Sequence, residues 1–239
     1  MKTKTQITRS KERFHTEISW LDSRHSFSFG QHYNPEMMGF GPLRVVNDDW
    51  IAPNGGFPTH PHRDMEIVSI VLAGELAHKD SMGNGRTIKV GEIQYMSAGT
   101  GVQHSEFNPS ATEPVHLMQI WIQPNAQGLE PAYADQPLVG VQDDVWSLVL
   151  SPEGRNGSMA IRQDAEMRTV KLTPGASITY VPKQEGRGLW VFVITGQVES
   201  ADATLSEGDS LAVVDARELQ LKNVGSEAAS VLVFDLPMG

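Results

Sequence analysis

Residues 55–74 read GGFPTHPHRDMEIVSIVLAG and contain a pair of histidines followed directly by a strand-like run. The run IVSIVLAG (67–74) is short, apolar and rich in β-branched residues, and it ends at a glycine, as buried β-strands often do. Runs of the same kind recur along the whole chain, at HLMQIWIQP (116–124), LWVFVITG (189–196) and SVLVFDLP (230–237). Many short strands separated by turn residues predict an all-β sandwich or barrel.

The order of strands and glycine turns occurs twice. In the first half, LAGEL (72–76) is followed by KVGEIQYMSAG (89–99). In the second half, ITGQV (194–198) is followed by LSEGDSLAVVD (205–215). Each half thus has a strand, a glycine turn, short strands and a second turn at Gly-Glu or Gly-Asp before another strand. The repetition predicts two copies of one β-barrel.

The repeat divides the chain into two barrels and a connection. We predict the first barrel over residues 1–125 and the second over residues 146–239. We predict the connection over residues 126–145. It overlaps PNAQGLEPAYADQP (124–137), which is interrupted by Pro and Gly and lacks a strand pattern. Such a segment is typical of a linker.

Composition and charge exclude several classes of function. The chain of 239 residues has a net charge of −10 and no cysteine. Acidity without a cluster of Lys or Arg argues against direct binding of nucleic acid, which depends on neutralising phosphates. No apolar run approaches the roughly 20 residues of a membrane-spanning helix, and the polar N-terminus lacks the apolar core of a secretory signal. We expect a cytoplasmic protein that acts neither on nucleic acid nor at membranes, with any metal held by nitrogen and oxygen.

The histidines distinguish the two predicted barrels, because all eight lie within residues 15–116. His60 and His62 are two residues apart, and so are His104 and Glu106. Side chains two apart on a strand point to the same face. Two such pairs on neighbouring strands would bring three imidazoles and one carboxylate to one ion. This ligand set suits Fe(II), Mn, Ni, Cu or Zn and leaves positions open for substrate or oxygen.

The residues alone leave the carboxylate ligand open. Asp64 and Glu66 share the parity of the histidine pair if that strand continues, so Glu66 competes with Glu106 for the role. His116 opens a later strand of the same predicted barrel and is a reserve ligand.

Four further polar residues are interpreted as structural. His25 and His32 have no partner pair at a ligand spacing, and we expect them to form hydrogen bonds within the fold. Asp48 and Asp49 follow the strand-like run LRVVN, and we expect them in a turn at its end. The alternative is that their carboxylates support the metal ligands.

The motifs resemble those of the cupin superfamily. The first cupin motif corresponds to His60, His62, Glu66 and Gly74, and the second to Gly91, Ser97-Ala98-Gly99, His104 and Asn108. Ser97 stands where the superfamily has Pro, and four residues rather than two separate Gly99 from His104. These departures match one branch, the pirins, for which RHSFSFG (24–30) and SAGTGVQHSE (97–106) are specific. The resemblance covers most of residues 20–125.

The pirin resemblance implies a bicupin, that is, two tandem jelly-roll barrels with metal in the N-terminal barrel only. It implies four ligands, His60, His62, His104 and Glu106, and leaves Glu66 either orienting a histidine or in solvent. Among pirins the chain looks most like the short bacterial quercetin 2,3-dioxygenases. The implied reaction opens the central ring of a flavonol with O₂ and releases carbon monoxide. Glu106 would act as the general base beside one divalent ion, for which we expect Fe(II).

Two other classes of function stay open. Some pirins resemble redox-responsive regulators, in which the oxidation state of the metal alters a surface for a protein partner. Other cupins act on different small molecules, since one fold hosts many activities. A deep apolar pocket above the metal would favour the dioxygenase, whereas a shallow charged mouth would favour the regulator.

Overall fold

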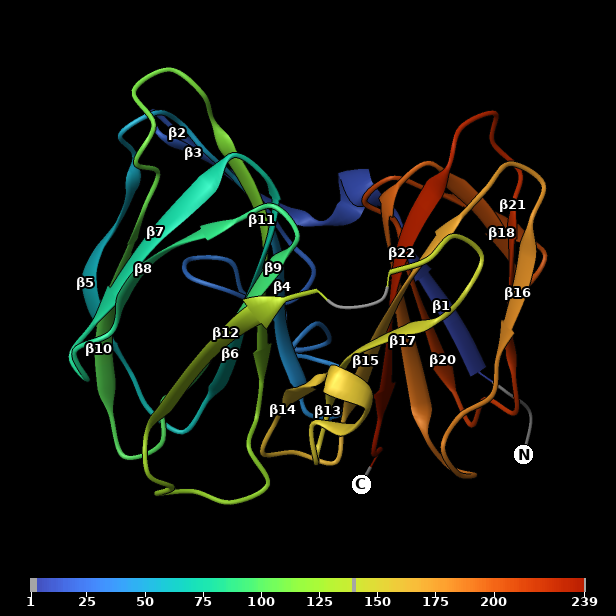
Figure 1. Cartoon of the computed structure of the whole chain (residues 1–239). Coiled ribbons are helices and arrows are strands. Elements are labelled where there is room, and N and C mark those ends of the chain that lie inside the picture. The colour runs from blue at the N-terminus through green and yellow to red at the C-terminus, as the bar shows by residue number, and fades with distance from the viewer. Residues whose placement is uncertain (1–3, 139–140, 239) are drawn as a thin grey trace. The chain divides into compact units, whose positions relative to one another are not determined.

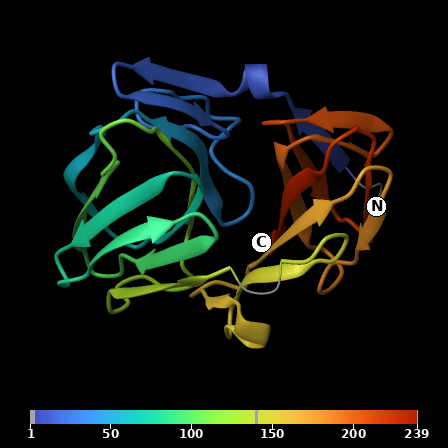
Figure 2. The same ribbon diagram turned by 45° about the horizontal axis from the view of Figure 1, so that its top comes forward.

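The computed structural model describes residues 4–138 and 141–238. Within them, regular structure is β-strand apart from the 3-10 turns η1 (Ser10–Glu12) and η2 (Arg155–Gly157). No helix in this part of the chain is long and apolar enough to cross a membrane. The chain divides into two compact units, and in each of them two sheets curl into a barrel (Figure 1, Figure 2). The prediction of two tandem cupin-type barrels is confirmed.

The first barrel comprises Phe14–Gly39 and Leu43–Leu138. Its larger sheet has the strand order β12-β9-β6-β11-β4-β3-β2, and its smaller sheet has the order β5-β10-β7-β8. The strands are β2 (Phe14–Ile18), β3 (Leu21–His25), β4 (Leu43–Ile51), β5 (Gly56–His62), β6 (Glu66–Ala73), β7 (Glu75–Asp80), β8 (Gly85–Lys89), β9 (Glu92–Ser97), β10 (Val102–Phe107), β11 (Val115–Ile122) and β12 (Ala132–Pro137).

The second barrel comprises Phe40–Pro42 with the described parts of Met1–Arg13 and Val139–Gly239. Its sheets have the orders β1-β20-β17-β22-β15-β13-β14 and β16-β21-β18-β19. The strands are β1 (Lys4–Thr8), β13 (Ser147–Ser151), β14 (Met159–Ala160), β15 (Glu166–Leu172), β16 (Ser177–Tyr180), β17 (Gly188–Thr195), β18 (Gln197–Ser200), β19 (Ala203–Ser206), β20 (Ser210–Val214), β21 (Leu219–Asn223) and β22 (Ala229–Leu236).

The two barrels repeat one strand order. β9-β6-β11-β4 corresponds to β20-β17-β22-β15, and β5-β10-β7-β8 corresponds to β16-β21-β18-β19. The internal repeat expected from the glycine turns is therefore present in the sheets.

The division of the chain differs from the predicted boundaries at the N-terminus. β1 pairs antiparallel with β20, with Thr5 opposite Val213, so this strand belongs to the second barrel (Figure 1). Arg9 reinforces the attachment with an ion pair to Asp209 at 2.7 Å. Sequence pattern does not reveal which distant strand a short edge strand will pair with.

The predicted linker also contains a strand. Ala132–Pro137 form β12, which pairs with β9 at the edge of the larger sheet, so the linker prediction is wrong over these residues. Their side chains are mostly half-buried and show no alternation, because an edge strand is covered on neither face completely. Val139 and Gly140 of the predicted linker lie outside the described residues.

The interiors of the barrels differ in polarity. A cluster of buried, mostly aliphatic side chains lies in the second barrel, including Val170, Leu189 and Val231. In the first barrel, buried side chains include Ser69, Gln119 and Glu106. Burying a polar group without a partner costs about 1–3 kcal/mol, so a polar interior is typical of a barrel that holds a site.

Candidate metal centre

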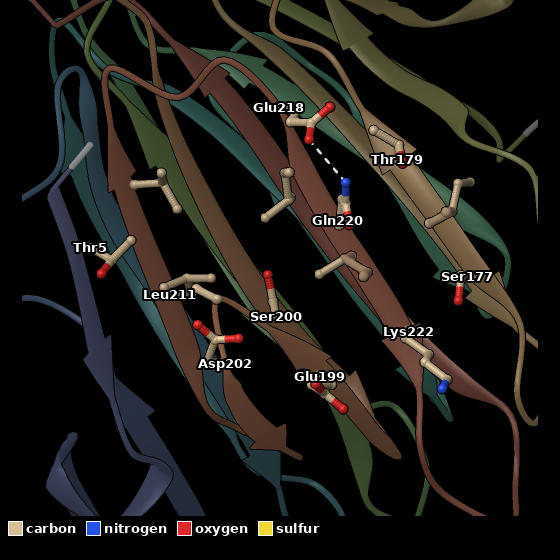
Figure 3. A pocket seen from close by; sticks show the side chains of 15 residues that line it. Thr5, Ser177, Thr179, Glu199, Ser200, Asp202, Leu211, Glu218, Gln220 and Lys222 are labelled. Carbon is tan, nitrogen blue, oxygen red and sulfur yellow. Dashed lines mark hydrogen bonds between the residues drawn. The ribbon is translucent and has the colours of Figure 1, made fainter. Parts of the chain in front are cut away.

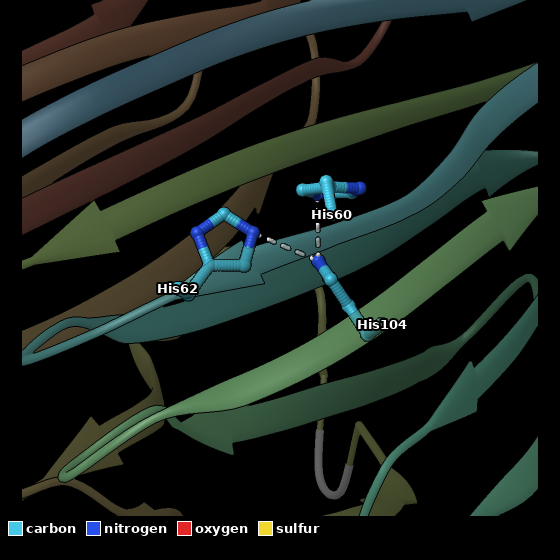
Figure 4. A group of neighbouring side chains, drawn as sticks. All are labelled: His60, His62 and His104. Carbon is cyan, nitrogen blue, oxygen red and sulfur yellow. Dashed lines mark hydrogen bonds between the residues drawn. The ribbon is translucent and has the colours of Figure 1, made fainter.

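Strands β5 and β10 bring the predicted histidines together. In their antiparallel register, His104 lies opposite His60, and Val102 lies opposite His62. The alternation of side chains then turns all three rings toward one another (Figure 4). β5 ends at His62, and Asp64 has a left-handed φ of 47°, so the parity of the strand does not continue to Asp64.

The three imidazoles converge through their Nε2 atoms (Figure 4). The Nε2 atoms of His62 and His104 are 2.9 Å apart, and those of His104 and His60 are 3.0 Å apart. One ligand nitrogen of each ring lies within 4.8 Å of the other two. The Nδ1–H of His60 donates to the carbonyl oxygen of Pro58 at 2.8 Å. Because this bond places the proton on Nδ1, the lone pair on Nε2 of His60 faces the other rings.

Burial favours the uncharged form of two of these imidazoles. It lowers the pKa of His62 and of His104 to about 3, and the neighbouring imidazoles add to the effect in both. Neutral imidazole is the form that binds metal ions. The Nε2 atom of His104 faces the Nε2 atoms of His60 and His62. A neutral imidazole has one N–H group, so hydrogen bonds among these rings cannot satisfy all three converging nitrogens at once. A divalent metal ion would satisfy all of them, so the triad suits such an ion.

Glu106 lies on the same strand as His104 but is held differently. A register shift between the two residues interrupts the pairing with β5. The carboxylate accepts hydrogen bonds from Gln119 Nε2 at 2.8 Å and from the Ser69 hydroxyl at 3.3 Å. Burial raises its pKa. Among the described residues, the group of ligand atoms within 4.8 Å of one another contains the three histidines, not this carboxylate.

Glu66 is buried at the start of β6, away from solvent. Its carboxylate accepts hydrogen bonds from the hydroxyls of Tyr95 and of Ser97. Of the two alternatives for Glu66, orienting a histidine or lying in solvent, the second is therefore wrong. These bonds fix the start of β6 to β9 on the larger sheet.

Comparisons with known proteins agree with this architecture. The family model described as Pirin matches residues 6–122, and the model of the quercetinase C-terminal cupin domain matches residues 148–236. The chain is 44% identical over 232 residues to the quercetin 2,3-dioxygenase of Escherichia coli strain K12. The aligned region covers 97% of this chain and 98% of that relative. This chain belongs to the pirin family.

Solved structures place the chain close to a bacterial pirin. YhhW of Escherichia coli matches with a TM-score of 0.93 and 42% identity, over 99% of both chains. A second structure of YhhW, in complex with nickel(II), matches equally well and covers 99% of this chain and 100% of that one.

The remaining histidines of this pirin lie apart from the triad. His116 Nε2 is 2.6 Å from Asp48 Oδ1, and the His116 ring stacks on Trp50. His116 therefore does not lie where it could act as the reserve ligand that the sequence suggested. His25 and His32 both contact the Thr16 hydroxyl, in line with their interpretation as hydrogen-bonding groups.

Asp48 and Asp49 lie inside β4, so the expected strand-end turn is wrong. The strand runs on to Ile51, because the buried Asn47, Asp49 and Ile51 alternate with the more exposed Asp48 and Trp50. Asp49 is buried and accepts a hydrogen bond from the Ser23 hydroxyl.

His78 is a site residue of this pirin that the sequence analysis missed. It lies on β7 directly opposite Glu106, and its ring centre is 5.3 Å from that of His104. Its ring stacks on Tyr133 of β12. Neither ring nitrogen has a hydrogen-bond partner within the described residues, and burial lowers the pKa of the imidazole. His78 and Asp80 are two residues apart on β7, the same spacing as His104 and Glu106, so this local signal could have pointed to His78.

One cavity of the first barrel adjoins the triad, and a second cavity shares two lining residues with it. The inner cavity has a volume of about 60 Å³ and the outer cavity about 340 Å³. Phe29 and Trp121 line both, and their rings meet edge to face with centres 5.3 Å apart. The inner cavity is lined by Leu21, Ser23, His25, Phe29, Asn47, Asp49, Phe57, His60, His62, Glu106, Gln119 and Trp121. The outer cavity is lined by Ser28, Phe29, Gly30, His32, Tyr33, Met38, Arg44, Val45, Met65 and Trp121.

The second barrel of this pirin contains a larger cavity, of about 580 Å³ (Figure 3). Carboxylates and hydroxyls line it, including those of Glu199, Asp202 and Ser200. Glu218 accepts a hydrogen bond from Gln220 along its wall (Figure 3). Residues 117–239 contain neither His nor Cys, so this cavity lacks the nitrogen and sulfur ligands of a transition metal.

Proposed function

We propose that this pirin is a metal-dependent dioxygenase that opens the central ring of a flavonol such as quercetin with O₂. The convergence of three Nε2 atoms on one point carries this proposal, because it supplies the metal site that the reaction needs. The activity is that of the relative from Escherichia coli with 44% identity. A cytoplasmic location is part of the proposal and fits a cysteine-free chain that handles Fe(II).

We assign His60, His62 and His104 as ligands of one divalent ion, with Glu106 as the fourth. We favour Fe(II), and Ni(II), which the YhhW structure contains, also suits three imidazoles and a carboxylate. When bound, the ion would lower the pKa of the 3-hydroxyl of the flavonol and support the reaction with O₂.

Glu106 is the general base in this proposal. Its raised pKa makes the carboxylate a better proton acceptor than an exposed glutamate at neutral pH. Gln119 and Ser69 hold both carboxylate oxygens in place through hydrogen bonds. Glu106 would take the proton of the 3-hydroxyl, with its share in metal binding changing as it does so.

The substrate needs both cavities. The inner cavity, at about 60 Å³, is smaller than the roughly 300–1,000 Å³ of a pocket for a small organic ligand. Together with the outer cavity of about 340 Å³ the space reaches that range. Phe29 and Trp121 stand between the two, so the flavonol would pass between their rings, with its chelating end at the triad.

The overall reaction is balanced without an external reductant. The carbon that carries the 3-hydroxyl leaves as carbon monoxide, and the two atoms of O₂ remain in an ester carbonyl and a carboxylic acid. The acid ionises at neutral pH, so one proton leaves the site in each turnover.

The test is oxygen uptake and quercetin loss by protein that is purified without oxygen and loaded with Fe(II). We expect turnover in the wild-type protein and none in His104→Ala. His116→Ala is the matched control, because it removes an imidazole of the same barrel outside the triad, and it should keep its activity. No turnover with Fe, Mn, Ni or Cu in protein that holds one ion would contradict the proposal and favour a redox-responsive regulator with a protein partner.

A further inference from the structure

Arg44 is the one permanently charged side chain among the described residues that line the outer cavity of the first barrel, and that lining includes no Asp or Glu. The inner cavity differs, because Asp49 and Glu106 belong to its lining. The carboxylates of the chain are thus at the inner cavity and the guanidinium is at the outer one. A negatively charged group of a ligand is therefore favoured in the outer cavity.

The segment between β3 and β4 fixes the position of Arg44. Its Nη1 donates to the carbonyl oxygen of Ser28 at 2.9 Å. The hydroxyl of Ser28 donates to the carbonyl oxygen of Asn34 and accepts from the amide of Asn34, each at 2.9 Å. The amide of Ser28 donates to the carbonyl oxygen of Met37 at 2.6 Å. Ser28 belongs to the run RHSFSFG (24–30), so this sequence motif helps to hold the guanidinium at the cavity wall.

The guanidinium of Arg44 has hydrogen-bonding capacity to spare. Arginine carries five N–H donors, and within the described residues the bond to Ser28 is the one that this side chain forms. No carboxylate in the described part of the chain forms an ion pair with it. A half-buried arginine with unused donors and no counter-ion suits an anionic ligand, because its planar fork matches the geometry of an oxyanion.

The other walls of the outer cavity suit a flat aromatic ring. The rings of Phe29 and Trp121 meet edge to face with centres 5.3 Å apart, and Val45 and Met65 add aliphatic and thioether surface. Aromatic and thioether groups make favourable contacts with the faces and edges of aromatic rings. One cavity of about 340 Å³ thus offers surface for an aromatic ring and a cation for a negative charge.

We propose that the outer cavity is a subsite for the anionic end of an aromatic substrate, and that Arg44 selects this end. The inference rests on the proposed function and narrows its substrate class to flavonols with a negatively charged group on a ring remote from the 3-hydroxyl. The 3-hydroxyl would face the triad, and the charged ring would lie on the outer side of Phe29 and Trp121. Arg44 determines specificity in this proposal and takes no part in the transfer of protons or electrons.

A pair of probes of similar shape tests the subsite by binding alone. Naphthalene-2-sulfonate carries one negative charge, and methyl 2-naphthyl sulfone has a methyl group in place of the charged oxygen. An NMR titration of protein loaded with Zn(II) should show at least about tenfold tighter binding of the sulfonate, as expected for hydrogen bonds to a charged group. Equal affinities of the two probes would overturn the proposal.

Three variants assign this preference to one side chain. Arg44→Gln keeps a donor for the carbonyl of Ser28 but has no charge, so it should bind both probes equally. Arg44→Lys restores the charge and should recover part of the preference. Lys89→Gln is the matched control, because it removes an exposed cation of the same barrel that lines neither cavity. A preference that survives in Arg44→Gln, or that disappears in Lys89→Gln, would show that Arg44 does not select the anion.

Turnover distinguishes this inference from the proposed function. With Fe(II)-loaded protein, a flavonol sulfonated on a ring remote from the 3-hydroxyl should have a KM at least about tenfold lower than its methyl sulfone analogue, with similar kcat. Arg44→Gln should abolish the difference, and a difference that persists in this variant would contradict the selection. If the probes bind as expected but neither flavonol is oxidised, the proposed function fails and the anionic subsite stands.

Discussion

His78 lies directly opposite Glu106 across the pairing of β7 with β10. Burial raises the pKa of Glu106, and the imidazole of His78 acts in the opposite direction by favouring the charged carboxylate. The ionisation of the proposed base therefore depends on a residue outside the histidine triad.

Replacing His78 separates this electrostatic role from metal binding. We expect His78→Phe to retain one ion per chain, because the converging Nε2 atoms belong to other residues. The phenyl ring would keep the stacking on Tyr133 and remove two buried nitrogens without hydrogen-bond partners, each of which costs about 1–3 kcal/mol. Metal analysis and urea unfolding of the metal-free protein would check both expectations. Loss of the ion would instead identify His78 as a ligand.

Glu106→Gln tests the general base. The amide keeps the size of the side chain but does not accept a proton at neutral pH, so kcat should fall by roughly 10²–10⁴-fold. Glu66→Gln is the matched control, since it changes a buried carboxylate that is bonded to Tyr95 and Ser97 on the larger sheet. Stopped-flow turnover of metal-loaded protein would separate the two. Full activity of Glu106→Gln with metal bound would exclude the base role.

Phe29→Ala tests the passage between the cavities. Removing the ring should join the inner and outer cavities and lower KM for flavonols that carry bulky substituents, while the metal content stays the same. Phe27→Ala serves for comparison, because Phe27 is buried nearby in sequence but lines neither cavity. Steady-state kinetics with a series of flavonols would measure the effect. A KM that is unchanged across the series would show that substrate does not pass Phe29.

The second barrel should show an acid-sensitive ion pair. Lys183 donates to Asp164 at 2.6 Å and Arg187 does so at 2.9 Å. The bond from Lys183, followed by Arg187, holds the pKa of Asp164 below its ordinary value of 3.8. A carboxyl group with a lowered folded-state pKa stabilises the fold above its unfolded pKa, and this stability is lost as the pH falls through the folded value.

Urea unfolding from neutral pH down to about pH 3 would measure this dependence, with the expected loss of stability beginning near the unfolded pKa. Asp164→Asn should remove that part of the pH dependence and leave the stability at neutral pH lower than in the wild type. Parallel pH profiles of the two proteins would contradict the role of Asp164.

Local alternation was sufficient to find the triad. His60, His62 and His104 lie on strands whose period of two is visible in the sequence, and the pairing of β5 with β10 joins them. The same reasoning failed where pairing between strands decides the outcome. Asp49 reaches the inner cavity from the larger sheet, which no local pattern encodes, and His78 was missed although it lies two residues before Asp80 on one strand.

Edge strands were missed for a related physical reason. Ala132–Pro137 are half-buried on both faces, so they lack the alternation that marks a strand. For Glu66 the sequence left two alternatives, orienting a histidine or lying in solvent. The solvent alternative was wrong, because its two hydroxyl partners lie on a strand about 30 residues later.

The pairing of β1 with β20 has a consequence for how the protein is made. A ribosome releases Lys4–Thr8 first, yet the partner of this strand follows about 200 residues later, after the whole first barrel. The first barrel is thus able to fold during synthesis, whereas the second is closed only when the chain is nearly complete, by contacts of very high sequence separation. Until then β1 has no partner strand. A fragment that begins after residue 13 would leave the backbone edge of β20 open to the strands of neighbouring chains, so it should aggregate more readily than the full chain.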